Sequence, residues 1–296
     1  MGIGFPRFAI LCHTLFEAMS TFLDRILSDV TDELSSTKAN RPIADIRARL
    51  ADAPPPRDFA GALKSLSFSL IAEIKEKSPS VGPMREANVR DAASAYEESP
   101  VVVALSVLTN AFHFGMTIDR MAAIRAEVTK PVLRKDFMID EYQVREARAF
   151  GADAILLMAN VLDSARLAGF HNLALELGMS VLFEVHTQEE IQMLPENATM
   201  VGINSRKFKS DSGFVDTGGQ STTDFSLDFG AFELAERLPT QAIRVAESGL
   251  DPSRIAAVRK HFQAGLVGTS LLRDTRGIRA CLEEFEVAIL ESAPAV

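Results

Sequence analysis

The sequence predicts an α/β protein built as a single (β/α)8 TIM barrel with an N-terminal helical extension, and three observations support this. Eight short apolar runs follow one another, separated by segments with helical spacing of apolar residues. The runs are apolar on both faces, as expected of parallel strands covered by helices. Charged and polar side chains gather where the runs end, the edge at which such barrels keep their active sites. A doubly wound open sheet is the alternative, but no G-x-G-x-x-G follows the first run.

Composition is that of one large domain. The 296 residues are 47% hydrophobic, enough to fill a barrel core of roughly 250 residues. The net charge is −9, the sequence pI is near 5.2 and no basic run occurs, so we expect no nucleic-acid or membrane partner. Cys12 and Cys281 form no C-x-x-C pair, and no histidine stands at ligand spacing. These features argue against a disulfide framework and a structural zinc site, and they fit a reducing compartment.

The first twenty residues form a segment of their own. Residues 8–16 are apolar, but Arg7 is the nearby cation, His13 interrupts the run and no A-x-A site follows. The run is also too short to span a bilayer. We therefore expect residues 1–20 to be a leader helix or a mis-assigned start, and not an export signal.

Two helices are expected before the first strand. Apolar residues recur at helical spacing over residues 22–30 and 43–50, and the proline-rich stretch 52–57 is one that helices do not cross. The chain then divides into a helical extension over residues 21–66 and a barrel over residues 67–290.

The strands and helices of the barrel are expected to alternate. Strands are predicted at residues 69–73, 101–107, 131–135, 154–158, 181–185, 200–204, 243–246 and 266–268. Helical periodicity appears between them, for example over residues 141–150, 164–177 and 229–238. Eight such units close into a barrel.

Charged side chains stand at the ends of five of these runs. Glu73 and Lys75 are two residues apart, so the period of a strand places both on one face. Alone, each such residue is as well explained by a surface ion pair, a helix cap or a solvated loop charge. The strand ends of a barrel converge on one mouth, however, and buried charges need partners, so together they predict a shared cavity. The other four ends carry Lys135 and Asp136, Glu184, Asn204 and Arg206, and Glu247 and Ser248.

Small residues follow the last two strands. Ser248 and Gly249 come after the seventh run, and Gly268 and Thr269 come after the eighth. Backbone N–H groups and a short helix at these two strand ends commonly hold a phosphate in barrels, and the glycines would leave room for it. We expect a small phosphorylated metabolite as the ligand.

Several longer strings stand along the chain in one order: IAEIKEKSPSVGPMR, ALSVLTNAFHFG, PVLRKDFMIDEYQVREARAFGADAILLM, LGMSVLFEVH, VGINSR, VAESG and VGTSLLR. In this order and spacing they closely resemble the indole-3-glycerol phosphate synthase family of tryptophan biosynthesis, over about residues 22–273. E-x-K-x-x-S-P-S and L-R-K-D-F are specific together, because related phosphate-binding barrels lack the pair.

The resemblance implies ring closure of 1-(2-carboxyphenylamino)-1-deoxyribulose 5-phosphate, with loss of carbon dioxide and water, to indole-3-glycerol phosphate. It implies no metal and no organic cofactor. Lys135 would be the general acid that activates the substrate carbonyl, and Glu184 the base or cation stabiliser. Glu73, Lys75 and Asn204 complete the implied catalytic set. How the dehydration divides between Lys75 and Lys135 stays open.

The same resemblance implies a substrate-binding set. Arg206, with Lys75, suits the two anionic groups of the substrate, since arginine offers a carboxylate a bidentate fork. Ser78 would lie near the carboxylate, and Phe112 and Phe137 would offer apolar faces to the anilino ring. The phosphate would rest on the four residues Ser248, Gly249, Gly268 and Thr269.

The chain departs from the family pattern in the connection after the sixth run. GINSRKF stands where the family usually has GINNRDL, with Ser205 and Lys207 at the altered positions. Residues 210–223 also lengthen this connection by roughly a dozen residues. We interpret the extra length as a tolerated flexible insertion, since loop closure makes it inexpensive. A specialised paralogue from a secondary indole pathway is the alternative.

Two further classes of function are considered beside the synthase. A barrel isomerase or aldolase acting on another sugar phosphate would need a different acid/base pair and no L-R-K-D-F. A non-catalytic binding relative would gain nothing from two lysines and two glutamates in one cavity. We expect the synthase, in the cytoplasm, as a monomer or weak homodimer.

Overall fold

The computed structural model of this chain describes residues 22–207, 210–215, 221–223 and 226–291. The expected leader, residues 1–20, lies outside the described residues, and so do residues 216–220 within the expected insertion. None of the described helices is long and apolar enough to cross a membrane.

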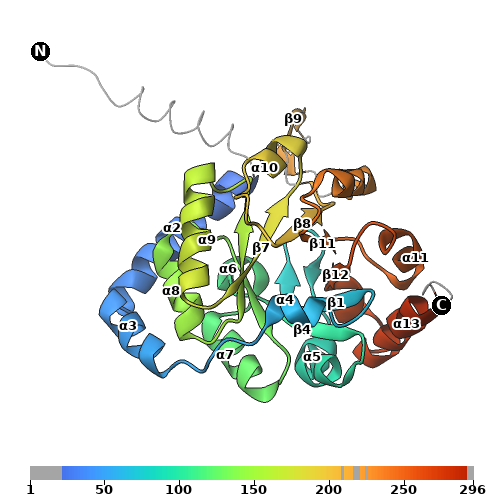
Figure 1. The fold of residues 1–296 in the computed structure, drawn as a ribbon, viewed down its shortest axis with the longest axis horizontal. Coiled ribbons are helices and arrows are strands. Elements are labelled where there is room, and N and C mark those ends of the chain that lie inside the picture. Colours follow the sequence, from blue (N-terminus) through green and yellow to red (C-terminus); the bar gives the residue numbers. More distant parts are fainter. Residues whose placement is uncertain (1–21, 208–209, 216–220, 224–225, 292–296) are drawn as a thin grey trace, which may run out of the picture.

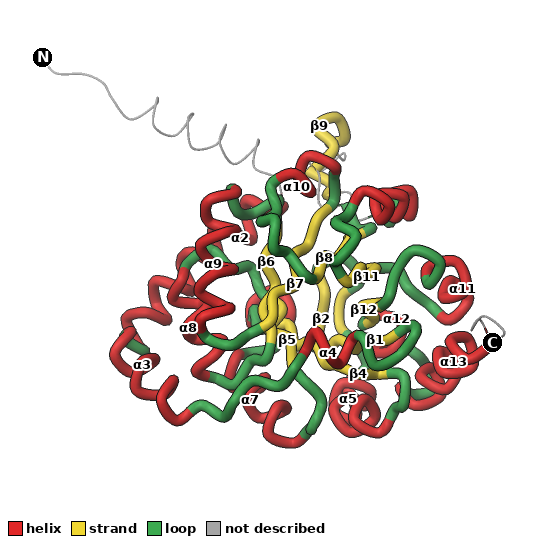
Figure 2. The backbone as a smooth tube through the Cα atoms, in the orientation of Figure 1, coloured by secondary structure: helices red, strands yellow, loops and turns green. Residues whose placement is uncertain are grey.

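Eight parallel strands close into a barrel, which confirms the predicted fold class (Figures 1 and 2). Each strand pairs with the barrel strand before it and the one after it, and β1 pairs with both β4 and β12. All eight lie within a few residues of the predicted runs. They are β1 (Ser69–Ile74), β4 (Val102–Leu108), β5 (Val132–Lys135), β6 (Ala154–Met158), β7 (Ser180–Val185), β8 (Met200–Asn204), β11 (Ile243–Glu247) and β12 (Ala264–Val267).

Helices surround the barrel and short elements occupy its loops (Figure 2). Several of these helices begin at a residue whose side chain caps the helix N-terminus. Asp140, for example, forms a capping box with Gln143 at the start of α8. The outer helices are α5 (Glu86–Glu98), α7 (Ile118–Glu127), α8 (Glu141–Ala149), α9 (Ser164–Glu176), α10 (Gln188–Gln192), α11 (Ile255–Val258) and α13 (Ile278–Glu291). The short loop elements are β2 (Lys77–Ser78), β3 (Gly82–Pro83), α6 (Ala111–Phe114), η2 (Pro252–Arg254) and α12 (Thr269–Arg273).

One predicted helix adopts a tighter form. Residues 229–238 were expected to be α-helical, but η1 (Phe229–Arg237) is a 3-10 helix. Its apolar residues Phe229, Phe232, Ala235 and Leu238 recur every three residues. That spacing matches three residues per turn rather than 3.6, and it places these side chains on one face.

The N-terminal helices close both ends of the barrel. Ile26 and Val30 of α2 (Phe22–Asn40) are buried in one cluster with side chains from the strands. Phe59 and Leu63 of α4 (Phe59–Leu63) join the same cluster from the amino-terminal end, beside Ser69, whose hydroxyl donates to the Leu63 carbonyl (3.1 Å). Helix α2 runs beyond the predicted residues 22–30, since no proline or glycine interrupts it.

The proline-rich stretch 52–57, called the joint below, is anchored to the barrel by a buried ion pair. Helix α3 (Ile43–Asp52) packs beside α8 (Figure 1), and the joint follows it. Arg125 donates to Oδ1 of the fully buried Asp153 (2.9 Å) and to the Pro55 carbonyl (3.0 Å). Asp153 also accepts the backbone N–H groups of Arg57 and Val132, both at 2.8 Å. The extension and the barrel therefore share one buried polar centre around Asp153.

Part of the expected insertion forms a small hairpin. Strands β9 (Ser210–Val215) and β10 (Ser221–Thr223) pair antiparallel, and β9 projects from the rim of the barrel (Figure 1). At its base, Lys207 N–H donates to the Ser226 carbonyl (3.1 Å) and Asp228 N–H donates to the Ser205 carbonyl (2.7 Å). The chain therefore leaves and rejoins the barrel at one point, so β8 and η1 keep their places.

Candidate active site

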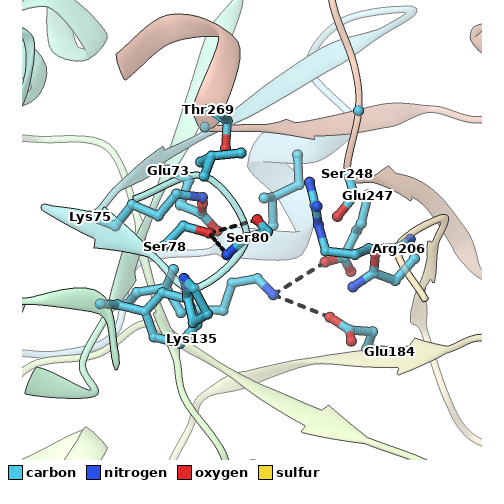
Figure 3. Close-up of a pocket in the computed structure, with 18 of the residues that line it drawn as sticks. Glu73, Lys75, Ser78, Ser80, Lys135, Glu184, Arg206, Glu247, Ser248 and Thr269 are labelled. Carbon is cyan, nitrogen blue, oxygen red and sulfur yellow. Dashed lines mark hydrogen bonds and ion pairs between the residues drawn. The ribbon is translucent and has the colours of Figure 1, made fainter. Parts of the chain in front are cut away.

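The carboxyl ends of the strands surround a cavity of about 610 Å3. This volume falls in the range of pockets that hold small metabolites. All of the site residues predicted from the sequence line the cavity except Phe112 (Figure 3). The predicted residues that line the cavity are Glu73, Lys75, Ser78, Lys135, Phe137, Glu184, Asn204, Arg206, Ser248, Gly249, Gly268 and Thr269.

Lys135 lies at the centre of the cavity between two buried carboxyl groups (Figure 3). Its Nζ is 3.2 Å from Oε2 of Glu184 on β7 and 3.6 Å from Oε2 of Glu247 on β11. Both glutamates are buried. Three strand ends thus bring one amine and two carboxyl groups together, an arrangement that individual strands do not reveal in the sequence.

Mutual charge sets the protonation states of this cluster. Burial acts to lower the pKa of Lys135, but Glu184, Glu247 and Glu73 outweigh it and hold that pKa above its ordinary value. Burial acts to raise the pKa of Glu184, yet Lys135 and then His186 bring it below its ordinary value. Burial and the Glu184 carboxylate raise the pKa of Glu247 well above its ordinary range. The cluster therefore combines an ammonium, a carboxylate and a carboxylic acid, so it holds proton donors and a proton acceptor.

A glycine on β8 makes room for Glu247. A Cβ placed on Gly202 would lie 2.0 Å from Oε1 and 3.0 Å from Cδ of Glu247. Strands β8 and β11 are neighbours, with Val245 paired to Gly202. The absence of a side chain at this position lets the carboxyl group lie where it reaches Lys135.

Glu73 and Lys75 form a second acid/base pair at the end of β1, as their spacing predicts. Nζ of Lys75 donates to Oε1 of Glu73, and both side chains are nearly buried. The hydroxyl of Tyr96 donates to the Glu73 carbonyl (3.1 Å) and so holds this strand end in place. The pair lines the same cavity as Lys135, and the charge of Glu73 contributes to the raised pKa of Lys135.

The two glycines at the predicted phosphate end are also required by the packing around them. A Cβ on Gly268 would lie 2.5 Å from Oε1 of Glu73, and one on Gly249 would lie 2.6 Å from Cδ1 of Leu227. Protein atoms therefore occupy the position that a side chain would take at both glycines. Ser248 has φ of 70° and Gly249 has φ of 68°, so the chain makes a left-handed turn here. Such a conformation in a serine costs on the order of 1–3 kcal/mol, and it is concentrated at functional sites.

Asn204 and Arg206 lie side by side at the end of β8. Oδ1 of Asn204 accepts the backbone N–H of Arg206 (3.0 Å), and Arg206 forms an isolated bridge with Leu227. Burial lowers the pKa of Arg206 from its very high ordinary value, with Glu73 opposing the shift, so the side chain stays a cation. Arg206 therefore presents a positive charge to the cavity opposite Lys75.

Of the two aromatic residues predicted at the site, Phe137 lines the cavity and Phe112 does not. Phe112 is 68% exposed and lies edge-on against His113 (ring centroids 4.8 Å apart), outside the cavity. Phe114 lines the cavity instead and stacks on Phe137 at 6.5 Å between ring centroids. Residues 112 and 114 belong to the helical turn α6, where side chains two residues apart point in different directions.

Sequence reasoning also missed three other contributors. Phe22 and Ile26 of α2 line the cavity, although this helix lies far from the barrel in sequence. No local pattern indicated where that helix would dock. Glu247 was noted as a strand end without a role, yet Val245 is buried with the barrel interior, and a period of two places Glu247 on the same face. The alternation along this strand therefore indicates that Glu247 faces the barrel interior.

Comparison with known proteins gives a consistent result. A family model described as "Indole-3-glycerol phosphate synthase" matches residues 23–283. The chain is 38% identical over 257 residues to a protein of that name from a Nocardioides species, covering 85% of this chain and 93% of the relative. It is 39% identical over 263 residues to one from Aromatoleum aromaticum, covering 86% and 95%. A third, from Salinibacter ruber, is 37% identical over 258 residues, covering 86% and 91%.

Solved structures with low sequence identity share the fold. A 3-hexulose-6-phosphate synthase from Salmonella typhimurium has a TM-score of 0.56 at 14% identity, covering 76% of this chain and 100% of that one. A 3-keto-L-gulonate-6-phosphate decarboxylase from Vibrio cholerae has a TM-score of 0.55 at 15% identity, covering 76% and 99%. At these identities the likeness concerns the barrel architecture alone.

Proposed function

Because the chain belongs to the indole-3-glycerol phosphate synthase family, we propose that the side chains lining the barrel mouth close the indole ring. The enzyme is a decarboxylating lyase of tryptophan biosynthesis that acts on a small phosphorylated substrate. One observation carries the assignment of its active centre, namely that Lys135 lies 3.2 Å from Glu184 and 3.6 Å from Glu247 inside the cavity.

The charge and polarity of the cavity lining support one orientation of the substrate, 1-(2-carboxyphenylamino)-1-deoxyribulose 5-phosphate. Its phosphate lies at the left-handed turn of Ser248 and Gly249, beside Gly268 and Thr269. Its carboxylate faces Arg206 and Lys75, with Ser78 nearby, since cations and a hydroxyl suit that group. Its anilino ring lies against Phe137 and Phe114, which stack with their ring planes 23° apart.

Ring closure begins at the substrate carbonyl in this arrangement. The Lys135 ammonium donates a proton to the carbonyl oxygen while the ring carbon bearing the carboxylate attacks the carbonyl carbon. The new carbon–carbon bond interrupts aromaticity in the ring. Glu184 and Glu247 hold the ammonium in place, and the Glu184 carboxylate compensates the cation that forms on the ring and its nitrogen.

Decarboxylation and dehydration complete the reaction. Carbon dioxide leaves, and the electron pair of the broken bond restores the aromatic ring. An acid then protonates the hydroxyl group, which leaves as water, while Glu184 removes a proton from the neighbouring CH2 carbon. Lys75 and Lys135 are the two candidate acids for this last step. Product analysis of Lys75→Ala assigns the step: accumulated hydroxylated dihydroindole would identify Lys75 as the acid, whereas normal product would identify Lys135.

Turnover of this substrate by the purified protein tests the function. We expect indole fluorescence to appear together with one equivalent of carbon dioxide, and Lys260→Ala, a change at an exposed lysine, to leave the rate unchanged. A sugar-phosphate isomerase would release no carbon dioxide, and a binding relative would bind the substrate without converting it. A paralogue with an altered substrate specificity would convert this compound poorly or not at all.

We also propose that the enzyme works in the cytoplasm as a monomer or weak homodimer, with residues 21–66 as an extension of the barrel over residues 67–290. Sedimentation velocity over a range of concentrations tests the oligomeric state. A stable higher oligomer at low concentration would contradict it.

A further inference from the structure

The proposed reaction takes up one proton from solvent in every turnover. The carbonyl oxygen leaves as water and so receives two protons, whereas the CH2 carbon next to the anilino nitrogen gives up one. The carboxylate leaves as neutral carbon dioxide without releasing a proton. The reaction therefore consumes one proton in each turnover. This proton has to reach the Lys135 cluster, in which the carboxyl groups of Glu184 and Glu247 are buried.

Glu184 connects this cluster to a second pair of groups. Its Oε2 faces Lys135 at 3.2 Å, and its Oε1 lies 3.6 Å from Nε2 of His186. Nδ1 of His186 is in turn 3.3 Å from Oε2 of Glu190 on α10. The side chain of Glu184 is 0% exposed, whereas those of Lys135, His186 and Glu190 are 14%, 16% and 15% exposed. A row of ionisable groups therefore leads from Lys135 at the cavity, through the buried Glu184, to a second partly exposed pair.

This row leads away from the substrate. His186 is not among the residues that line the cavity, so it lies behind Glu184 as seen from the cavity. The backbone fixes the row, because Oε2 of Glu190 also accepts the His186 backbone N–H (2.6 Å) and the Thr187 hydroxyl caps α10 by accepting the Glu190 N–H (3.2 Å). His186 therefore touches no reacting atom and acts only through Glu184.

The charges around His186 suit proton transfer near neutral pH. The charged groups that face it are Glu184 from β7, Glu190 from α10 and Lys135 from β5. Burial acts to lower the pKa of His186, but Glu190 and Glu184 outweigh it and raise the pKa above its ordinary value. An imidazole can take a proton at one nitrogen and release one at the other, so it can pass protons between two carboxylates. The 3.6 Å distance between Nε2 of His186 and Oε1 of Glu184 is of the kind that shortens when substrate binds.

We propose that His186, held by Glu190, delivers the solvent proton that the reaction consumes to the Glu184–Lys135 cluster. This inference rests on the proposed function, because the proton balance belongs to that reaction. The sequence shows Glu184 and His186 two residues apart in FEVH, but it gives no indication that Glu190 would turn back to the imidazole.

The simpler alternative is that His186 only stabilises the position of α10. A structural residue and a proton relay, which passes protons from solvent to the cluster, respond differently to a small proton carrier added to the solution. We therefore compare His186→Gln and Glu190→Gln with wild type, using kcat and KM from pH 5 to 9 with and without free imidazole. Thermal unfolding of each variant records any loss of the fold.

For a relay, we expect His186→Gln to lower kcat about tenfold at neutral pH with little change in KM, and imidazole to restore most of the loss. We expect Glu190→Gln to keep more activity, but its kcat should decline at a lower pH than wild type, since removing that carboxylate lowers the pKa of the imidazole. A lower solvent deuterium isotope effect in the presence of imidazole would accompany the rescue.

Two results would overturn the relay. One is wild-type kcat at every pH in His186→Gln, and the other is a loss that imidazole does not restore and that follows a lower melting temperature. Failure of the proposed function is distinguished from both, because wild-type protein would then form no product from the substrate.

Discussion

Replacing Gly268 by alanine tests how the barrel mouth holds its acid/base groups. The added Cβ would lie 2.5 Å from Oε1, 3.0 Å from Cβ and 3.1 Å from Cδ of Glu73. The carboxylate oxygen would have to move about 0.9 Å to regain an ordinary contact of 3.4 Å, and a misplacement of about 1 Å costs about 10²-fold in rate. The Cβ of Glu73 cannot swing away, so some overpacking remains, at about 1–3 kcal/mol.

Steady-state kinetics separate this explanation from one based on phosphate crowding. We expect Gly268→Ala to lower kcat about 10²-fold with a smaller change in KM, because Glu73 and Lys75 are displaced. The matched control is Gly169→Ala in α9, where a Cβ meets no atom within 4 Å. It should keep wild-type kcat and gain about 0.4–1 kcal/mol of stability. A higher KM with unchanged kcat in Gly268→Ala would refute the packing argument.

Further substitutions test other parts of the structure. Gly202→Ala should lower kcat by pushing Glu247 away from Lys135, since its Cβ would lie 2.0 Å from Oε1 of Glu247, and an unchanged kcat would contradict that geometry. Asp153→Ala should lower the free energy of unfolding by about 3–5 kcal/mol, measured by urea denaturation, because Arg125 is left buried without its partner. Phe114→Ala should raise KM about tenfold, whereas Phe112→Ala should change it less than twofold, and equal effects would contradict the assigned stacking. Burial acts to raise the pKa of Glu184 and Lys135 outweighs it, so the folded-state pKa lies below the unfolded value of about 4.3. Stability should therefore decline as pH falls below about 4.3, and less so in Glu184→Gln.

The barrel could be predicted because its signals are local. A parallel strand buried on both faces is an apolar run, and β6 and β8 were placed to the residue. The cavity at the carboxyl ends of the strands could also be predicted, because charged residues such as Glu73 and Lys135 follow otherwise apolar strands. The apolar runs recur at every unit and the charged ends at five of the eight, so several independent observations support one architecture.

The remaining features depend on contacts between distant residues. The docking of Phe22 at the mouth depends on where α2 packs, and the requirement for Gly268 depends on the direction of Glu73 on the neighbouring strand. The choice between Phe112 and Phe114 depended on a helical turn too short to show periodicity. Side-chain direction at these positions follows from tertiary packing, which one sequence does not display.

Substrate binding and turnover by Lys135→Ala test whether this lysine is the proton donor of the reaction. We expect the variant to bind the carboxyphenylamino-deoxyribulose phosphate with an affinity near that of wild type, because the proposed phosphate and carboxylate contacts are intact. We also expect turnover to fall by at least about 10²–10⁴-fold, because the proton donor between Glu184 and Glu247 is gone. Near wild-type turnover in a well-folded Lys135→Ala would contradict the assignment of this cluster as the acid/base centre.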